Sequence, residues 1–84
     1  MDADMRMLDA ERKHAVRWLQ LYITPSQATA LRDELTRLLA DPEGREHIHV
    51  SADDMSRDLS CSIVTKRKLR DAHYTALERA VLEV

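Results

Sequence analysis

The sequence predicts a small two-layer α+β domain in which two helices cover one face of a three-stranded antiparallel sheet. Three observations predict it: a helix with clear start and stop signals, alternating apolar residues in three other segments, and a length of 84 residues with one cysteine. The expected order is strand, helix, strand, strand, helix. We expect the domain to span residues 14–84, and residues 1–13 to be a polar segment whose order the pattern leaves open.

The first expected strand spans residues 14–23, which are dense in β-branched and aromatic side chains. Alternation places Leu19, Leu21 and Ile23 on one face of this strand, and Val16, Trp18, Gln20 and Tyr22 on the other. One long helix over residues 2–22 is the alternative. The charged residues 9–14 interrupt its apolar stripe, so the strand is favoured.

The first expected helix begins after Thr24, where Pro25 and Gln27 complete the pattern of an N-cap, a first-turn proline and a capping box. Four leucines then recur at helical spacing, at Leu31, Leu35, Leu38 and Leu39. The turn residues 41–44 predict that the helix ends near residue 40.

Two short alternating segments, residues 46–50 and 58–64, predict a hairpin joined by the polar residues 51–56. A second capping box, formed by Thr75 and Glu78, predicts a helix over residues 76–83. The pattern leaves open whether residues 66–74 belong to that helix, to a separate turn or to a loop.

The sheet face that the helices leave uncovered is the candidate functional surface. It would carry the only tryptophan and one of two tyrosines, and such side chains are frequent at protein interfaces. The sequence therefore favours a cytosolic, non-catalytic protein-interaction module, homodimeric or bound to another protein. The expected interface residues are Trp18, Gln20, Tyr22, His47 and His49.

Two alternatives concern other ligands. His47 and His49 stand two apart on a predicted strand, so both imidazoles could reach one metal ion or small ligand, although a metal site needs further ligands. The basic residues Lys66, Arg67, Lys68 and Arg70 could contact nucleic acid, but the net charge of −2 and the missing aromatic RNA-binding motif oppose this.

Catalysis and membrane insertion are not expected. The only glycine is Gly44, which excludes a glycine-rich phosphate loop, and no nucleophile motif is present. No cofactor is therefore predicted. The N-terminal residues lack the basic start and apolar stretch of a secretory signal, and no run approaches the ~20 apolar residues that span a bilayer. These features, with a lone thiol, predict a cytoplasmic location.

Overall fold

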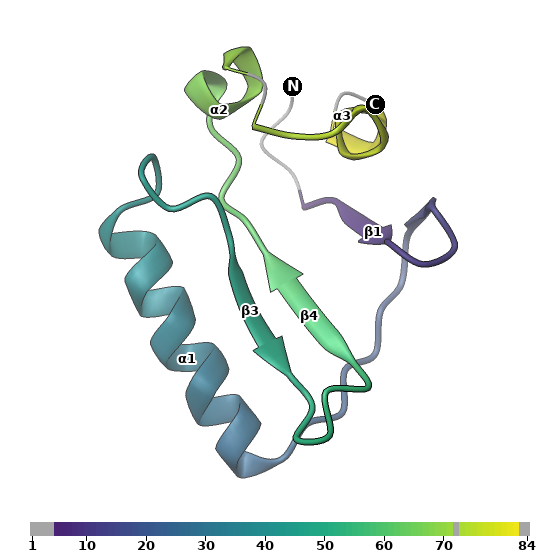
Figure 1. Ribbon diagram of the computed structural model, residues 1–84, viewed down its shortest axis with the longest axis vertical. Coiled ribbons are helices and arrows are strands. Elements are labelled where there is room, and N and C mark those ends of the chain that lie inside the picture. Colours follow the sequence, from purple (N-terminus) through teal and green to yellow (C-terminus); the bar gives the residue numbers. More distant parts are fainter. Residues whose placement is uncertain (1–4, 72, 83–84) are drawn as a thin grey trace.

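The computed structural model describes residues 5–71 and 73–82 (Figure 1). Over these residues the elements are β1 (Met7–Asp9), β2 (His14–Val16), α1 (Pro25–Ala40), β3 (Ile48–Ser51), β4 (Asp58–Cys61), α2 (Lys66–Arg70) and α3 (Ala76–Leu82). β1 pairs with β2 and β3 pairs with β4, both antiparallel, in two separate sheets. None of the helices within these described ranges has the length and hydrophobicity that a membrane span requires.

The predicted three-stranded sheet with two helices on one face is wrong. Of the expected strand 14–23, only His14–Val16 is a strand, and its partner is β1 rather than the β3–β4 hairpin. Alternation identifies residues that suit a strand but does not say which strand they pair with. Met7–Asp9 lies only four residues upstream, so its pairing closes a short loop. The alternative helix does not form over residues 5–22, and its first residues lie outside the described ranges.

Helix α1 begins and ends where the sequence predicts. The Thr24 backbone N–H donates to Gln27 Oε1 at 3.0 Å, and the Gln27 N–H donates to Thr24 Oγ1 at 3.2 Å, which completes the capping box. At the other end the Asp41 carboxylate accepts the Gly44 backbone N–H at 3.0 Å and holds the turn that follows the helix. Local side-chain-to-backbone bonds therefore fix both ends of α1.

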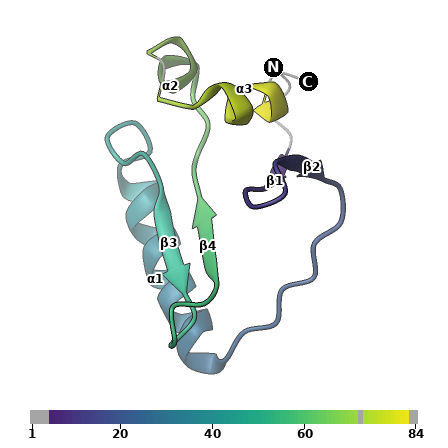
Figure 2. The same cartoon turned by 45° about the vertical axis from the view of Figure 1, so that its right-hand side comes forward.

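The predicted hairpin is confirmed, and it consists of β3 and β4. Helix α1 packs along β3 (Figures 1 and 2). Ile48 is opposite Cys61 and Val50 is opposite Leu59, so these apolar side chains share one face of the hairpin. Ile48 and Leu38 of α1 are the only buried hydrophobic residues among those described, with 3% and 0% of their surface exposed. The described core is therefore small.

A second unit joins the two ends of the described chain. The β1–β2 hairpin lies beside α3, which begins with the predicted capping box: Thr75 N–H donates to Glu78 Oε1 at 2.8 Å, and Glu78 N–H donates to Thr75 Oγ1 at 3.2 Å. The predicted last residue of this helix, Glu83, lies outside the described residues. Residues 7–9, which the sequence assigns to a separate N-terminal segment, thus contribute a strand. Between the units lie residues 66–74, whose structure the sequence did not decide. They contain the short helix α2.

Candidate functional site

The strongest candidate site is the connection between β2 and α1, residues 17–23, which we call the linker strand segment. Figures 1 and 2 show it running along the outside of the molecule, from the β1–β2 hairpin to the start of α1. It contains the part of the predicted first strand that joins no sheet. Its residues still have the composition of a strand, with Trp18, Tyr22 and Ile23 among them.

The backbone of the linker strand segment has no hydrogen-bond partner within residues 5–71 and 73–82. The β1–β2 ladder ends at Val16. The next backbone N–H after the segment, that of Thr24, is used by the helix cap, and Pro25 has none. Within the described part of the chain, seven consecutive residues therefore present unpaired amide and carbonyl groups, which a partner strand could pair with.

The side chains of this segment alternate in exposure. Trp18 and Tyr22 are 82% and 84% exposed, whereas Leu19, Leu21 and Ile23, which alternate with them and with Gln20, are 54%, 48% and 40% exposed. Gln20 is also exposed and lies midway between the two aromatic residues. Two aromatic side chains are therefore exposed to water. Burial of their apolar surface against a partner would be favourable.

The predicted interface face is divided by the fold. Trp18, Gln20 and Tyr22 lie in the linker strand segment, whereas His47 and His49 lie at the β3–β4 hairpin, and the two regions share no sheet. Both histidines are exposed. The five residues therefore do not form one continuous sheet face, because the strand that was to join them does not pair with the hairpin.

The two histidines lie together, as their spacing indicates. Their ring centroids are 4.6 Å apart in an edge-to-face arrangement. His49 Nδ1 lies 2.7 Å from Asp58 Oδ2, and Ser51 Oγ donates to Asp58 Oδ1 at 2.8 Å. The Ser51 hydroxyl, and after it His49, lower the pKa of Asp58 below its ordinary value.

The part of the chain that the structure describes contains no group of three or more His, Cys, Asp or Glu side chains that could hold a metal ion. The carboxylate of Asp58 faces Ser51 and His49 together. The contact with Asp58 orients the His49 ring.

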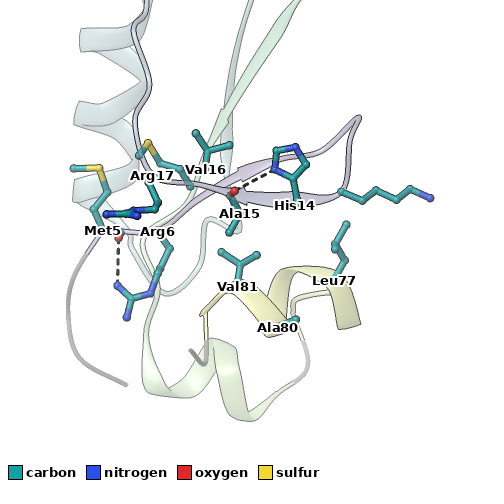
Figure 3. A pocket seen from close by; sticks show the side chains of 11 residues that line it. Met5, Arg6, His14, Ala15, Val16, Arg17, Leu77, Ala80 and Val81 are labelled. Carbon is teal, nitrogen blue, oxygen red and sulfur yellow. Dashed lines mark hydrogen bonds between the residues drawn. The ribbon is translucent and has the colours of Figure 1, made fainter.

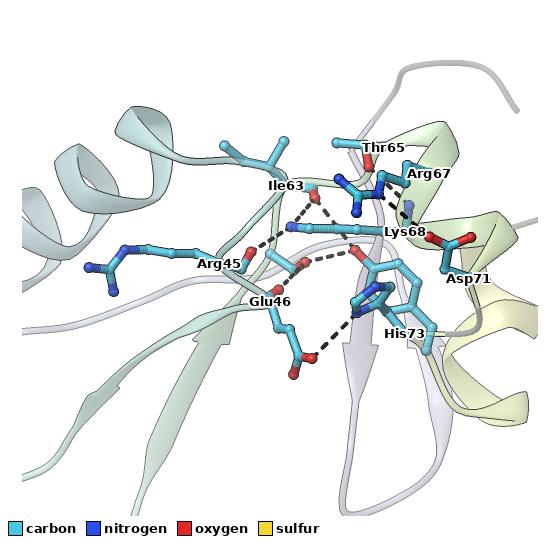
Figure 4. A network of polar contacts seen from close by, with 10 residues as sticks. Arg45, Glu46, Ile63, Thr65, Arg67, Lys68, Asp71 and His73 are labelled. Carbon is cyan, nitrogen blue, oxygen red and sulfur yellow. Dashed lines mark hydrogen bonds and ion pairs between the residues drawn. The ribbon is translucent and has the colours of Figure 1, made fainter.

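The four basic residues considered for nucleic-acid binding also differ in their surroundings. Lys68 is fully buried, and its Nζ donates to the carbonyl oxygens of Arg45 at 2.7 Å and Ile63 at 2.9 Å (Figure 4). It therefore cannot reach a phosphate without unfolding this junction. The other three candidates, Lys66, Arg67 and Arg70, are exposed.

Two of these exposed arginines face one carboxylate. Arg70 Nε lies 3.0 Å from Asp71 Oδ1, and Arg67 Nε lies 3.5 Å from Asp71 Oδ2. The hydrogen bond from Arg70 is the main cause that lowers the pKa of Asp71. The acidic neighbour reduces the positive potential that nucleic-acid binding at this run would require.

Two concave features were not predicted from the sequence. A groove of about 520 Å³ lies between the β1–β2 hairpin and α3, and its apolar lining includes Met7, Val16 and Val81 (Figure 3). Arg17, the first residue of the linker strand segment, also lines this groove. A smaller polar hollow of about 260 Å³ includes His47 and His73. Both join residues distant in sequence, so no local pattern could have indicated them.

Comparison with known proteins adds no functional assignment: no protein-family model, no curated protein and no solved structure matches this chain.

Proposed function

We propose that the protein is a non-catalytic protein-interaction module that binds by strand addition along the linker strand segment, residues 17–23. The observation that carries this proposal is a seven-residue backbone without a partner in residues 5–71 and 73–82, on which Trp18 and Tyr22 are exposed. In strand addition, the backbone hydrogen bonds provide affinity and the alternate side chains provide specificity.

The position of the segment supports this role. Capped helix α1 fixes one end, and the β1–β2 hairpin fixes the other. Because both ends are held, a partner strand meets a chain with less conformational freedom than a disordered tail, and binding costs less entropy. The aromatic pair supplies rigid apolar surface beside the backbone groups.

The experiment uses a displayed library of nine-residue peptides with alternating apolar and polar positions, screened at low protein concentration. Selected peptides are expected to bind the unaltered protein and to lose binding to Trp18→Ala. Leu39→Ser is the matched control, because Leu39 is 71% exposed but lies on α1. Binding that is equal in Trp18→Ala and the unaltered chain, or no selected peptide at all, would contradict strand addition at this segment.

A further inference from the structure

We infer that the partner strand is the linker strand segment of a second copy of this chain, paired antiparallel about Gln20. This inference rests on the proposed function and names its partner. The unpaired stretch runs from Arg17, after the β2 ladder, to Ile23, before the helix cap, so its midpoint is Gln20. With a two-fold axis through that midpoint, residues 17–23 of one copy pair with the same residues of the other copy.

The side chains match in this register. Trp18 of each copy lies opposite Tyr22 of the other, which forms two aromatic cross-strand pairs on one face. Leu19 lies opposite Leu21 on the other face. The two Gln20 side chains meet at the axis, where each amide can donate to and accept from the other. No apolar residue of the segment is left opposite a charge except Ile23, which faces Arg17 at the ends.

Charge selects the antiparallel direction. Arg17 is the only charged residue of the segment. A parallel pair in register would place the two guanidinium groups side by side, and like charges directly opposite each other are unfavourable. In the antiparallel pair they lie at opposite ends, about 20 Å apart at 3.4 Å per residue.

The need for burial also favours a second copy. Leu38 and Ile48 are the only buried hydrophobic residues in the described part of the chain, and the sequence provides no disulfide. A domain of this size has little core to stabilise it, and self-association is a common remedy. A second copy is always present with the first and carries the same exposed apolar row.

The first test measures solution mass by light scattering across a range of concentrations. The unaltered chain, Leu39→Ser and Gln20→Ala are expected to form a dimer of twice 9.7 kDa. The double variant Leu19→Pro/Gln20→Pro is expected to remain a monomer, because neighbouring N–H groups of a strand point to opposite edges and the two prolines remove a donor on whichever edge the partner uses. This variant should still fold, since the N–H groups of Leu19 and Gln20 have no partner among the described residues. Trp18→Ala should raise the dissociation constant about 30-fold.

The second test fixes the register by disulfide cross-linking in a Cys61→Ser background, which removes the only native thiol. Gln20→Cys is expected to cross-link rapidly under mild oxidation, because the antiparallel register places its Cβ atoms about 5 Å apart. Arg17→Cys is the matched control and should cross-link slowly. Equal cross-linking at both positions would indicate a parallel or irregular pair and overturn the register.

The outcomes separate this inference from the proposed function. A chain that stays monomeric at every concentration, yet binds library peptides through Trp18, overturns the self-pairing and leaves strand addition standing. A dimer that persists in Leu19→Pro/Gln20→Pro overturns the self-pairing, because that dimer uses another surface. A monomer that binds no library peptide overturns both.

Discussion

The α1–β3–β4 unit and the linker strand segment carry equally clear local patterns, but only the first finds its partners within the described chain. In the unit, α1 packs on β3, Leu38 and Ile48 are buried, and the ladder pairs the backbones of β3 and β4. In the segment, strand-forming residues are exposed to water, and their backbone has no partner in the part of the chain that the structure describes. The difference shows that a strand-like pattern does not say whether a segment pairs within its own chain; in our proposal, a second copy supplies the missing strand.

The largest effect is expected from the core of the α1–β3–β4 unit. Leu38→Ala should lower the free energy of unfolding by about 2–5 kcal/mol, because it leaves a cavity where the side chain was fully buried. Leu39→Ala, one residue later and 71% exposed, should change it by less than about 0.5 kcal/mol. Urea unfolding followed by circular dichroism measures both. Equal losses in the two variants would show that the unit is not packed around Leu38.

A smaller loss is expected at the buried lysine that joins α2 to the hairpin. Lys68→Met keeps the apolar stem but removes the donor to the carbonyl oxygens of Arg45 and Ile63. Leaving these acceptors without that donor should cost about 1–3 kcal/mol. Lys66→Met in the same helix is the control, since Lys66 is exposed. If both variants unfold at the same urea concentration, the buried contact has no net stabilising effect.

The helix cap that ends the linker strand segment should contribute about 1 kcal/mol. Thr24→Ala removes the hydroxyl that accepts the Gln27 N–H, while Thr24→Ser retains it. The thermal midpoint should fall for the first variant and stay nearly unchanged for the second. A fall of the same size in both would assign the effect to the lost methyl group and not to the cap.

The smallest effect concerns acid. Ser51 and His49 lower the pKa of Asp58 in the folded chain, so this carboxylate stabilises the fold above its unfolded pKa of about 3.9. That contribution is lost as the pH falls through the lower, folded value. In Ser51→Ala, the pKa of Asp58 measured by carboxyl NMR should rise toward the ordinary value. An unchanged pKa would show that the hydroxyl is not its main cause.

Elements that depend on residues close together in the sequence were predictable, and contacts between residues far apart in the sequence were not. Thr24 with Gln27, and Thr75 with Glu78, form their capping boxes because each pair lies three residues apart and needs no distant partner. The β3–β4 hairpin is similarly local, since a short polar loop joins its strands. For these elements, the residue pattern and the observed structure agree.

The pairing of the predicted strands could not be derived from local patterns, because it depends on which strand lies nearby in the fold. The pattern of residues 14–23 is strand-like throughout. Only the first three of them pair with β1, and the rest have no strand partner among the described residues. Lys68 illustrates the same limit. Its basic neighbours indicated a surface residue, and only the fold brings two carbonyl oxygens to its Nζ.

The candidate site was predictable in part. Trp18 and Tyr22 were expected to face solvent, and both do, although they lie on an unpaired segment instead of a sheet face. His47 and His49 were expected to point the same way, and their rings are in contact. What the sequence could not show is that the fold separates these two pairs into different elements.

Amide hydrogen exchange of residues 17–23, measured at low and high protein concentration, tests the central claim most directly. At low concentration these amides should exchange rapidly while the interior amides of α1 are protected, because the segment has no backbone partner among the described residues. At high concentration, amides of residues 17–23 should become protected and those of α1 should change little. Protection already present in the dilute monomer would contradict the claim, since the segment would then be paired within its own chain.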